Sequence, residues 1–414
     1  MELEHVLGGG GLDPFAPAKL GPVTLRNRVI KSATYEGLAH GGLVTRELVE
    51  FHRQLAAGGV GMTTVAYLAV APEGRTNEHQ VYWRPEALPG LRTLTDTIHA
   101  EGAAISAQIG HAGPVADPIG NGMPALGPSR AFPNQGARLT RKATVADIDR
   151  IVQAHADAAR RAVEAGFDAI EVHLGHSYFA SAFLSPLVNR RKDEFGGSLE
   201  NRAKVARRIA RAVRDSIGDR AAIIAKLNLT DGARGGISIE ESIQTAQWLE
   251  ADGSIDALEM TAGSSLLNPM FLFRGGAPVA EFAAVMRQPI RTGIRIMGKR
   301  FIREYPYEDL YLLEMSRRVR AEVTLPMVLL GGVVDRTGID TAMAEGFQFV
   351  AMARALVREP DLIGRLSREN GHQVRSLCIH CNRCMPTNMT GVRCPEITDA
   401  SPRSAAWGTP ADYA

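Results

Sequence analysis

The sequence lacks a long hydrophobic run and an excess of charge of either sign. No apolar stretch approaches the ~20 residues that a transmembrane helix needs, and the opening residues, MELEHVLGGGGLDP, contain no hydrophobic segment typical of a signal peptide. The 47 Lys and Arg residues nearly balance the 45 Asp and Glu residues, which gives a formal net charge of +2. Nothing in this balance points to nucleic acid or a membrane surface as a partner, and we expect a cytoplasmic protein.

Cysteine is absent before position 378. All four cysteines lie between Cys378 and Cys394, which excludes a disulfide framework spread over the fold. The composition is otherwise ordinary, with 45% hydrophobic and 22% charged residues. Such values are typical of a globular protein with a sizeable core.

The sequence also lacks a G-x-G-x-x-G motif after its first strand-like segment, which disfavours an open, doubly wound sheet. Instead, segments typical of strands and of amphipathic helices alternate from about position 28 to position 365. Most of the helical segments end in glycine, a common helix stop. The predicted strands are 28–33, 62–69, 103–108, 168–173, 222–227, 256–261, 326–330 and 347–352. Eight successive β-then-α units predict an α/β fold, a (β/α)₈ TIM barrel over residues 1–370, with a four-cysteine C-terminal extension over 371–414.

Three stretches do not fit simple β/α units. Residues 110–142 are rich in Gly and Pro and follow the third predicted strand, so we expect a long loop over the barrel mouth. Residues 264–307 follow the sixth strand, and a connection of this length is usually functional, as a wall of the substrate site or an oligomer contact. The tail after Cys394 is rich in Pro, Ser and Ala, and we expect it to pack loosely.

The most informative stretch is 168–202, DAIEVHLGHSYFASAFLSPLVNRRKDEFGGSLENR. A short apolar strand ends at His173, and His176 and Tyr178 follow directly. Side chains just past the carboxyl end of a barrel strand face the ligand crevice. Two imidazoles and a phenol there would offer hydrogen-bond donors to an electron-rich ligand and a source of protons. A histidine at such a place is otherwise a satisfied core or loop residue, but the clustering at one strand end favours a catalytic role for all three.

This stretch resembles the signature of the old yellow enzyme family of FMN-dependent ene-reductases, with H-x-x-H-x-Y followed by FLSPLVNRRKDEFGGSLENR. More narrowly, it is similar to the branch that includes the N-terminal domains of 2,4-dienoyl-CoA reductase and trimethylamine dehydrogenase. The resemblance extends over roughly residues 13–395. It implies an enzyme that uses NADH or NADPH to reduce the activated C=C bond of α,β-unsaturated carbonyl compounds. His173 and His176 would bind the substrate oxygen, and Tyr178 would protonate the α-carbon.

An FMN phosphate would need close backbone approach and a cation. Gly331 and Gly332 end the seventh predicted strand, and Arg354 follows the eighth, which is where such barrels commonly bind phosphate. Lys226 lies inside an otherwise apolar strand, and the resemblance places it beside the flavin pyrimidine, where it would stabilise negative charge. A structural salt bridge inside the barrel is the alternative for Lys226. By resemblance alone, the remaining flavin contacts are Ser32, Ala33, Thr34, Tyr67, Gln108 and Ala353. Tyr35 occupies a position near the flavin where relatives commonly carry Thr or Cys. This difference leaves open how the redox potential of the flavin is tuned here.

The cysteine spacing, Cys378-x2-Cys381-x2-Cys384-x9-Cys394, predicts a metal site. The resemblance favours a [4Fe-4S] cluster, zinc is the alternative, and unliganded thiols of a remnant site are the third interpretation. Relatives with the cluster pass electrons to a further nucleotide-binding domain, which we do not find in this sequence, so a cluster here would need a partner protein or serve structure.

Other functions stay open at this point. One is a flavin-dependent amine dehydrogenase or demethylase, against which the two histidines argue because they suit a carbonyl oxygen better than an amine cation. The others are an electron-transfer partner subunit without turnover and a phosphate-binding isomerase without flavin. We expect a small-molecule substrate and a homo-oligomer.

Overall fold

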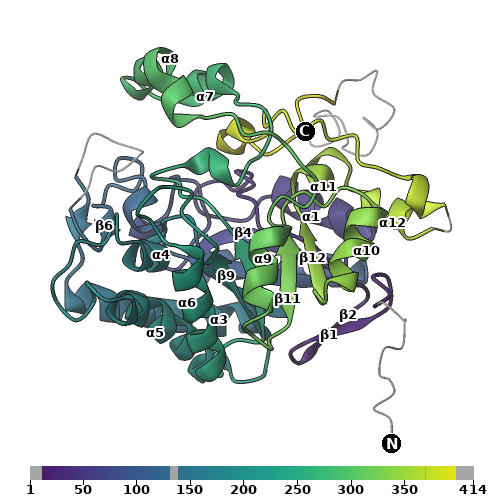
Figure 1. The fold of residues 1–414 in the computed structure, drawn as a ribbon, viewed down its shortest axis with the longest axis horizontal. Helices are drawn as coiled ribbons and strands as arrows, with labels where there is room; N and C mark the ends of the chain where they lie inside the picture. Colours follow the sequence, from purple (N-terminus) through teal and green to yellow (C-terminus); the bar gives the residue numbers. More distant parts are fainter. Residues whose placement is uncertain (1–11, 131–138, 369, 398–414) are drawn as a thin grey trace, which may run out of the picture.

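The computed structural model of this protein describes residues 12–130, 139–368 and 370–397. Its centre is a closed barrel of eight parallel strands, which run around the barrel in the order β3-β4-β5-β8-β9-β10-β11-β12 (Figure 1). The eight predicted strands are therefore confirmed, each within three residues at its ends. Their bounds are β3 Val29–Lys31, β4 Met62–Ala69, β5 Ala104–Gly110, β8 Ala169–Leu174, β9 Ala222–Asn228, β10 Ala257–Thr261, β11 Met327–Leu330 and β12 Phe349–Met352.

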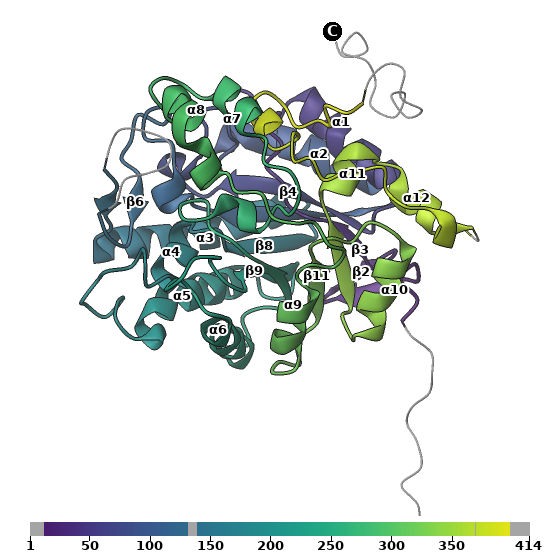
Figure 2. The ribbon, with the colours of Figure 1, turned by 45° about the horizontal axis from the view of Figure 1, so that its top comes forward.

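Helices surround the barrel (Figure 2), and α1, α3, α5, α6 and α10 each begin at a side chain that accepts a backbone N–H group. Thr144 begins α3 in a capping box with Asp147, and Ser238 begins α6 in another with Glu241. Ser198 begins α5, which ends at Gly218 with φ 55°. The helix bounds are α1 Arg46–Ala57, α2 Leu88–Ala100, α3 Val145–Glu164, α4 Phe179–Leu184, α5 Leu199–Ile217, α6 Ile239–Ala251, α7 Val279–Val285, α8 Ile290–Phe301, α9 Leu313–Arg320, α10 Arg336–Ala344, α11 Arg354–Arg358 and α12 Leu362–Leu366.

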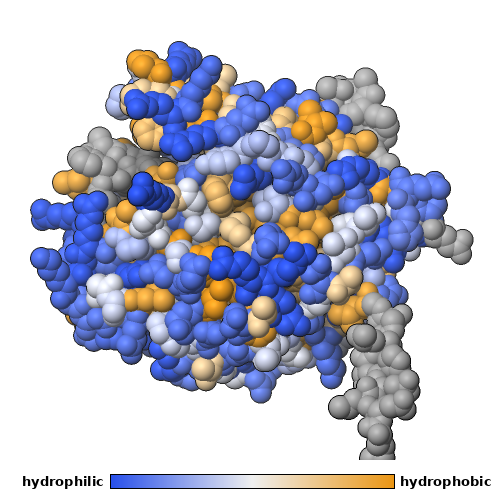
Figure 3. All heavy atoms as spheres, viewed as in Figure 1, coloured by the Kyte–Doolittle hydropathy of each residue, from blue (hydrophilic) through white to orange (hydrophobic). Residues whose placement is uncertain are grey.

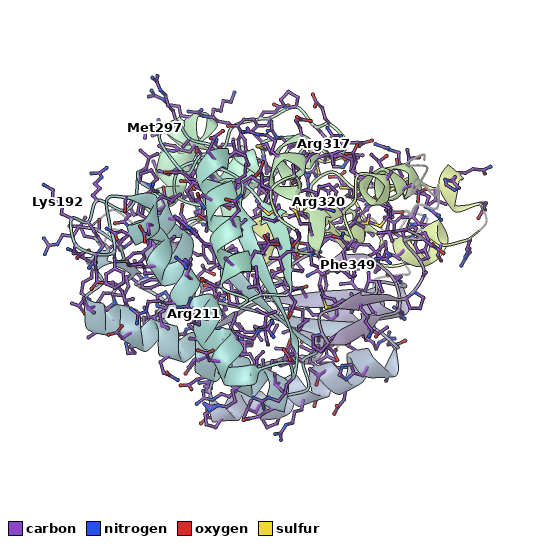
Figure 4. All side chains as sticks on the ribbon, turned by 60° about the horizontal axis from the view of Figure 1, so that its bottom comes forward. Lys192, Arg211, Met297, Arg317, Arg320 and Phe349 are labelled. Atoms are coloured by element: carbon purple, nitrogen blue, oxygen red, sulfur yellow. The ribbon has the colours of Figure 1, made fainter. Side chains whose placement is uncertain are left out.

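Side chains on each strand alternate between the inside of the barrel and the layer beneath the helices. On β8, Ala169 packs in the barrel interior, whereas Ile170 and Val172 pack in the outer core with the helices. The interior core is apolar at the amino-terminal end of the barrel, where Phe349 lies among the strands (Figure 4). The hairpin formed by β1 (Ala18–Leu20) and β2 (Val23–Leu25) packs against this core and closes that end.

Toward the carboxyl ends of the strands the interior becomes polar. The inward series is Ala169 and then Glu171 on β8, Ile224 and then Lys226 on β9, and Ala257 and then Glu259 on β10. All six side chains are buried. The alternation thus places a polar layer above an apolar layer, at the barrel end where ligand sites of such barrels lie.

The long connections lie at the carboxyl ends of the strands. Residues 110–142 contain the short strands β6 (Leu126–Gly127) and β7 (Arg141–Lys142), and the part of this predicted loop over 131–138 lies outside the described residues. The connection over 264–307 contains α7 and α8, two helices that the sequence analysis missed. The reason is that Gly298 is the only buried residue of α8, whose apolar side chains lie at the surface, with Ile296 77% and Phe301 60% exposed. Apolar atoms are visible on the surface in the region of α8 (Figure 3). The predicted loose packing of the tail concerns mostly 398–414, also outside the described residues.

None of the helices within the described ranges combines the length and the apolar character needed to cross a membrane.

Candidate active site

Two histidines and a tyrosine meet at the carboxyl end of β8. Nε2 of His173 lies 3.3 Å from Nδ1 of His176, and the ring of Tyr178 stands edge-on to the ring of His173 with 4.6 Å between centroids. Tyr67, from β4, contacts Tyr178 at 5.2 Å between centroids. The structure therefore brings together the three residues that the sequence predicts to be catalytic.

The backbone after β8 holds this cluster in a strained turn. His176 and Ser177 both have φ 60°, a left-handed conformation that costs free energy in residues with a side chain and that gathers at functional sites. The His176 N–H donates to Oδ1 of Asn228 at 3.1 Å, and its Nε2 lies 2.9 Å from Oγ1 of Thr261. Neighbouring strands β9 and β10 thus fix the direction of the imidazole.

Burial controls the protonation of these three side chains. Burial lowers the pKa of His173 far below the ordinary value, and together with the charge of Lys226 it lowers the pKa of His176 to about 3. Burial also raises the pKa of the Tyr178 phenol. At neutral pH the site therefore presents two neutral imidazoles and a protonated phenol, and Nδ1 of His173 is buried without a hydrogen-bond partner.

A cluster of charged side chains lies inside the barrel, deeper than the two histidines and the tyrosine. Nζ of Lys226 lies 2.6 Å from Oε1 of Glu259 and 3.2 Å from Oε1 of Glu171, and it donates to Oγ of Ser32 at 3.0 Å. Gln108 donates from Nε2 to Oε1 of Glu171 at 2.5 Å. These five side chains, which we call the charged floor, come from β5, β8, β9 and β10 and from the end of β3. The ion pair that the sequence left as the alternative for Lys226 is present.

The two carboxyl groups of the charged floor titrate differently. Burial and the charge of Glu259 raise the pKa of Glu171 to about 8. Burial opposes ionisation of Glu259 as well, but the adjacent Lys226 outweighs it and lowers the pKa of Glu259. Burial likewise opposes the charge of Lys226. The two adjacent carboxyl groups outweigh this effect of burial and raise the pKa of Lys226. At neutral pH the charged floor thus contains one ammonium, one carboxylate and one protonated carboxyl group.

Sequence reasoning missed Glu171 and Glu259, although the signal that singled out Lys226 applies to them. Each is a charged residue inside a short apolar strand, and each occupies an inward position. In the register of the barrel, Glu259 lies directly opposite Lys226. A search for charged residues in all predicted strands would have found the pair.

A second hollow lies beside the ends of β11 and β12. Its lining includes Gly331, Gly332, Ala353 and Arg354, all four of which the sequence assigns to the flavin. Gly331 and Gly332 have φ 104° and 83°, and a Cβ at Gly332 would lie 2.5 Å from the backbone nitrogen of Leu310. Only glycine fits this turn. The guanidinium of Arg354 donates to the backbone carbonyl of Arg274 at 2.7 Å and to Oδ1 of Asn382.

The other predicted flavin contacts lie between these two places. Ser32 continues from β3 with its N–H bonded to the carbonyl of Met352, and the following Thr34 has a buried Oγ1 without a partner. Ala33 packs against a small apolar cluster that includes Tyr67, whose hydroxyl donates to the carbonyl of Gly74 at 2.6 Å. Burial raises the pKa of Tyr35, so this phenol is protonated.

The four cysteines line one cavity, and all are free thiols. Arg354 lines the same cavity, and Nη1 of Arg358 lies 3.6 Å from Sγ of Cys394. Burial raises the pKa of Cys378 and that of Cys384, the latter to about 12. Within residues 12–130, 139–368 and 370–397, no three His, Cys, Asp or Glu side chains are grouped closely enough to hold a metal ion. The structure thus brings the predicted ligands to one cavity but does not arrange them around a single ion.

Comparisons with known proteins agree with this geometry. The model of the NADH:flavin oxidoreductase / NADH oxidase family matches residues 13–265. A 4,4'-dithiodibutanoate disulfide reductase of Rhodococcus erythropolis is 48% identical over 92% of this chain and 94% of its own length. A metal reductase of Desulforamulus reducens is 29% identical over 89% of this chain, which spans 50% of that protein. A solved 2-naphthoyl-CoA reductase complex is 24% identical with a TM-score of 0.80 over 95% of this chain and 58% of its own, a likeness that shows the fold.

Proposed function

Because this chain belongs to the NADH:flavin oxidoreductase / NADH oxidase family, the old yellow enzyme family, we propose that it is an FMN-dependent enzyme that uses NADH or NADPH to reduce a small organic acceptor at the cluster of His173, His176 and Tyr178. The observation that carries this proposal is the meeting of two neutral imidazoles and a protonated phenol at one strand end, above a buried cation.

The residues present fit FMN. Among the described residues, Oγ1 of Thr34 and Nδ1 of His173 are buried polar atoms without a hydrogen-bond partner, as expected where a polar ligand would bind. Arg354 and the turn at Gly331 and Gly332 would hold the phosphate, and Ser32, Gln108 and Lys226 would face the ring system. Bound FMN would supply hydride transfer in both directions, from the nicotinamide and to the acceptor. The chain would orient the flavin and the substrate and would place a proton at Tyr178.

The first substrate class that we propose is α,β-unsaturated carbonyl compounds. Their carbonyl oxygen would accept hydrogen bonds from His173 and His176, which polarises the C=C bond. The β-carbon gains a hydride and the α-carbon gains the phenolic proton of Tyr178, so one C=C bond is lost and two C–H bonds form. Tyr178 then regains its proton from solvent. Neutral imidazoles suit this role because each can donate a hydrogen bond to the oxygen and neither needs a buried counter-ion.

Organic disulfides are the second candidate, favoured by the 48% identity to a protein named a disulfide reductase. In that reaction the hydride and one proton convert one disulfide into two thiols, and the S–S bond breaks. Tyr178 would protonate the leaving thiolate in place of a carbon atom. The same two histidines would stabilise that thiolate, so the site does not have to change between the two reactions.

For the cysteine segment we propose an iron–sulfur cluster ahead of zinc. A zinc ion needs four ligands within ~2.3 Å of one point, whereas an iron–sulfur cluster spreads its four thiolates around a larger body. Four thiols around one cavity, beside Arg354 and Arg358, fit the second arrangement better.

An anaerobic absorption spectrum of the purified protein tests these proposals. We expect flavin bands that bleach with NADPH and return with cyclohexenone or with 4,4'-dithiodibutanoate, and the faster acceptor decides between the two substrate classes. Bands that bleach with an amine and not with NADPH would instead favour the amine dehydrogenase alternative. A colourless protein that FMN cannot reconstitute would contradict the central proposal, and iron and zinc analysis of the same sample decides the cysteine site.

A further inference from the structure

The charged floor contains two carboxyl groups for one lysine. Oε1 of Glu259 and Oε1 of Glu171 both lie within hydrogen-bond distance of Nζ of Lys226, at 2.6 and 3.2 Å, so the two carboxyl groups flank one ammonium. All three side chains are buried. Two buried carboxylates beside one ammonium would leave one negative charge without compensation, and they would repel each other. The geometry therefore favours a proton on one of the two glutamates.

The remaining contacts place this proton. Glu259 receives hydrogen bonds from Lys226 and from Oγ of Ser32 at 2.7 Å, whereas Glu171 receives one from Lys226 at the longer distance of 3.2 Å and one from the neutral Gln108. Hydrogen bonds to an ionised group favour its ionised form, so Glu259 holds the negative charge and Glu171 the proton. Within the described residues, the second oxygen of each carboxyl group has no hydrogen-bond partner. Because both glutamates contact Lys226, either one can supply its counter-charge.

We propose that Glu171 and Glu259 form one redundant counter-charge to Lys226: when either glutamate is neutralised, the other ionises, and the charged floor keeps a net charge of zero. The inference deepens the proposed function, because the charge of this floor acts on the flavin. Hydride transfer from NADPH adds two electrons and one proton to FMN and releases the oxidised nicotinamide, so the site gains one negative charge. A compensated lysine stabilises that charge less than a free lysine would, which keeps the reduced flavin a strong hydride donor. Both glutamates act through Lys226 and are positioning residues.

The test is the midpoint potential of the bound flavin in four proteins: wild type, Glu171→Gln, Glu259→Gln and the double variant. In each single variant, the ratio of the affinity for reduced flavin to the affinity for oxidised flavin should change less than about threefold. This corresponds to a shift of about 15 mV in the midpoint potential of a two-electron couple. The double variant leaves Lys226 without a counter-charge and should raise the ratio at least tenfold, about 30 mV. Glu36→Gln, which neutralises a buried glutamate paired with Lys31 on the outer side of the barrel wall, is the matched control and should leave the potential unchanged.

A measurement without flavin covers the case in which the double variant does not fold. Difference infrared spectra of the apoprotein should contain the band of one buried protonated carboxyl group in wild type and lack it in each single variant. Single variants with large potential shifts that add up in the double variant, or a protonated carboxyl band that survives in both single variants, would overturn the inference. Failure of wild type to bind FMN would contradict the proposed function instead, and the infrared result would still decide whether the two glutamates share a proton.

Discussion

Both sides of the barrel wall bury a lysine that is paired with a carboxyl group. The two clusters differ in how completely the oxygens of their carboxyl groups are hydrogen-bonded. On the outer side, beneath α1, Nζ of Lys31 lies 3.0 Å from Oε1 of Glu36 and donates to the carbonyl of Thr64. The N–H of Ala66 lies 3.3 and 3.2 Å from the two oxygens of Glu36, and Nε2 of His52 lies 3.4 Å from Oε1. Both oxygens of this glutamate therefore have partners.

On the inner side, each carboxyl group of the charged floor leaves one oxygen without a partner. Buried polar groups in folded proteins are nearly always hydrogen-bonded, and exceptions call for an explanation such as a missing ligand. The comparison teaches that burial of charge by itself does not identify a functional site. Lys31 pairs with a carboxylate whose two oxygens both have partners and supports the fold, whereas Lys226 pairs with carboxyl groups that each leave one oxygen unpartnered among the described residues, at the barrel end where ligands bind. Changes on the inner side should therefore alter chemistry, and changes on the outer side should alter stability.

The largest effect is expected from Tyr178→Phe on the inner side. Loss of the proton donor should slow re-oxidation of the reduced enzyme by cyclohexenone by 10²–10⁴-fold, a range typical of general acid catalysis. Reduction by NADPH should remain nearly unchanged, because it needs no proton from Tyr178. Anaerobic stopped-flow absorption separates the two half-reactions. Equal losses in both would refute the role of proton donor, and Tyr82→Phe, whose hydroxyl accepts a hydrogen bond from Arg84 and from none of the three catalytic candidates, serves as the control.

Lys31→Met tests the outer side. It leaves Glu36 buried without its cation, and breaking a buried pair in this way costs about 3–5 kcal/mol of stability. Denaturant unfolding of the FMN-loaded protein should register this loss, while the flavin potential and the half-reaction rates should stay near those of wild type. If Lys31→Met kept the stability of wild type but altered the flavin potential, the proposed difference between the inner and the outer side of the barrel wall would be contradicted.

Replacing both His173 and His176 by alanine should weaken the binding of phenolate ligands by about 100-fold or more, because each histidine contributes a hydrogen bond to a charged oxygen worth about 1.5 kcal/mol or more. Titration of the flavin absorption with a phenol measures the affinity. Unchanged affinity would place the anion site elsewhere. The double variant should retain its FMN, since neither histidine is assigned to the flavin.

The last prediction concerns the pH dependence of stability. The folded protein holds a proton on Glu171 up to about pH 8, whereas the unfolded chain releases it near 4.5, so the unfolded state binds fewer protons between these values. Stability should therefore fall as pH rises from about 4.5 to about 8, by at most about 1.4 kcal/mol per pH unit from this group. Lys226, Glu259 and Gln108 face Glu171, and ionisation of Glu259 opposes the slope at the acidic end. Comparing unfolding of wild type and Glu171→Gln across this range isolates the contribution, and identical slopes would contradict it.

Much of the barrel could be predicted from the sequence, because each strand is short, apolar and followed by a helix with a recognisable start or glycine stop. The position of His173, His176 and Tyr178 at one strand end followed from the same pattern. Helices α7 and α8 could not be predicted in this way, since they bury little and carry apolar side chains on exposed faces. The cysteine spacing predicted that the four thiols would share one place, which they do, although not the ligand geometry.

The sequence by itself determined the order of strands and helices, the strand end that carries the histidines and tyrosine, and the grouping of the cysteines. These features depend on local periodicity and on spacing along the chain. Only the tertiary structure decided that Glu171, Lys226 and Glu259 form one charged floor, because they lie on three strands separated by long stretches of chain. It also decided that Lys31 belongs to the outer side of the wall and Lys226 to the inner side. The physical reason is that the closed barrel fixes the register and the facing of every strand, and with them the partners of each buried charge.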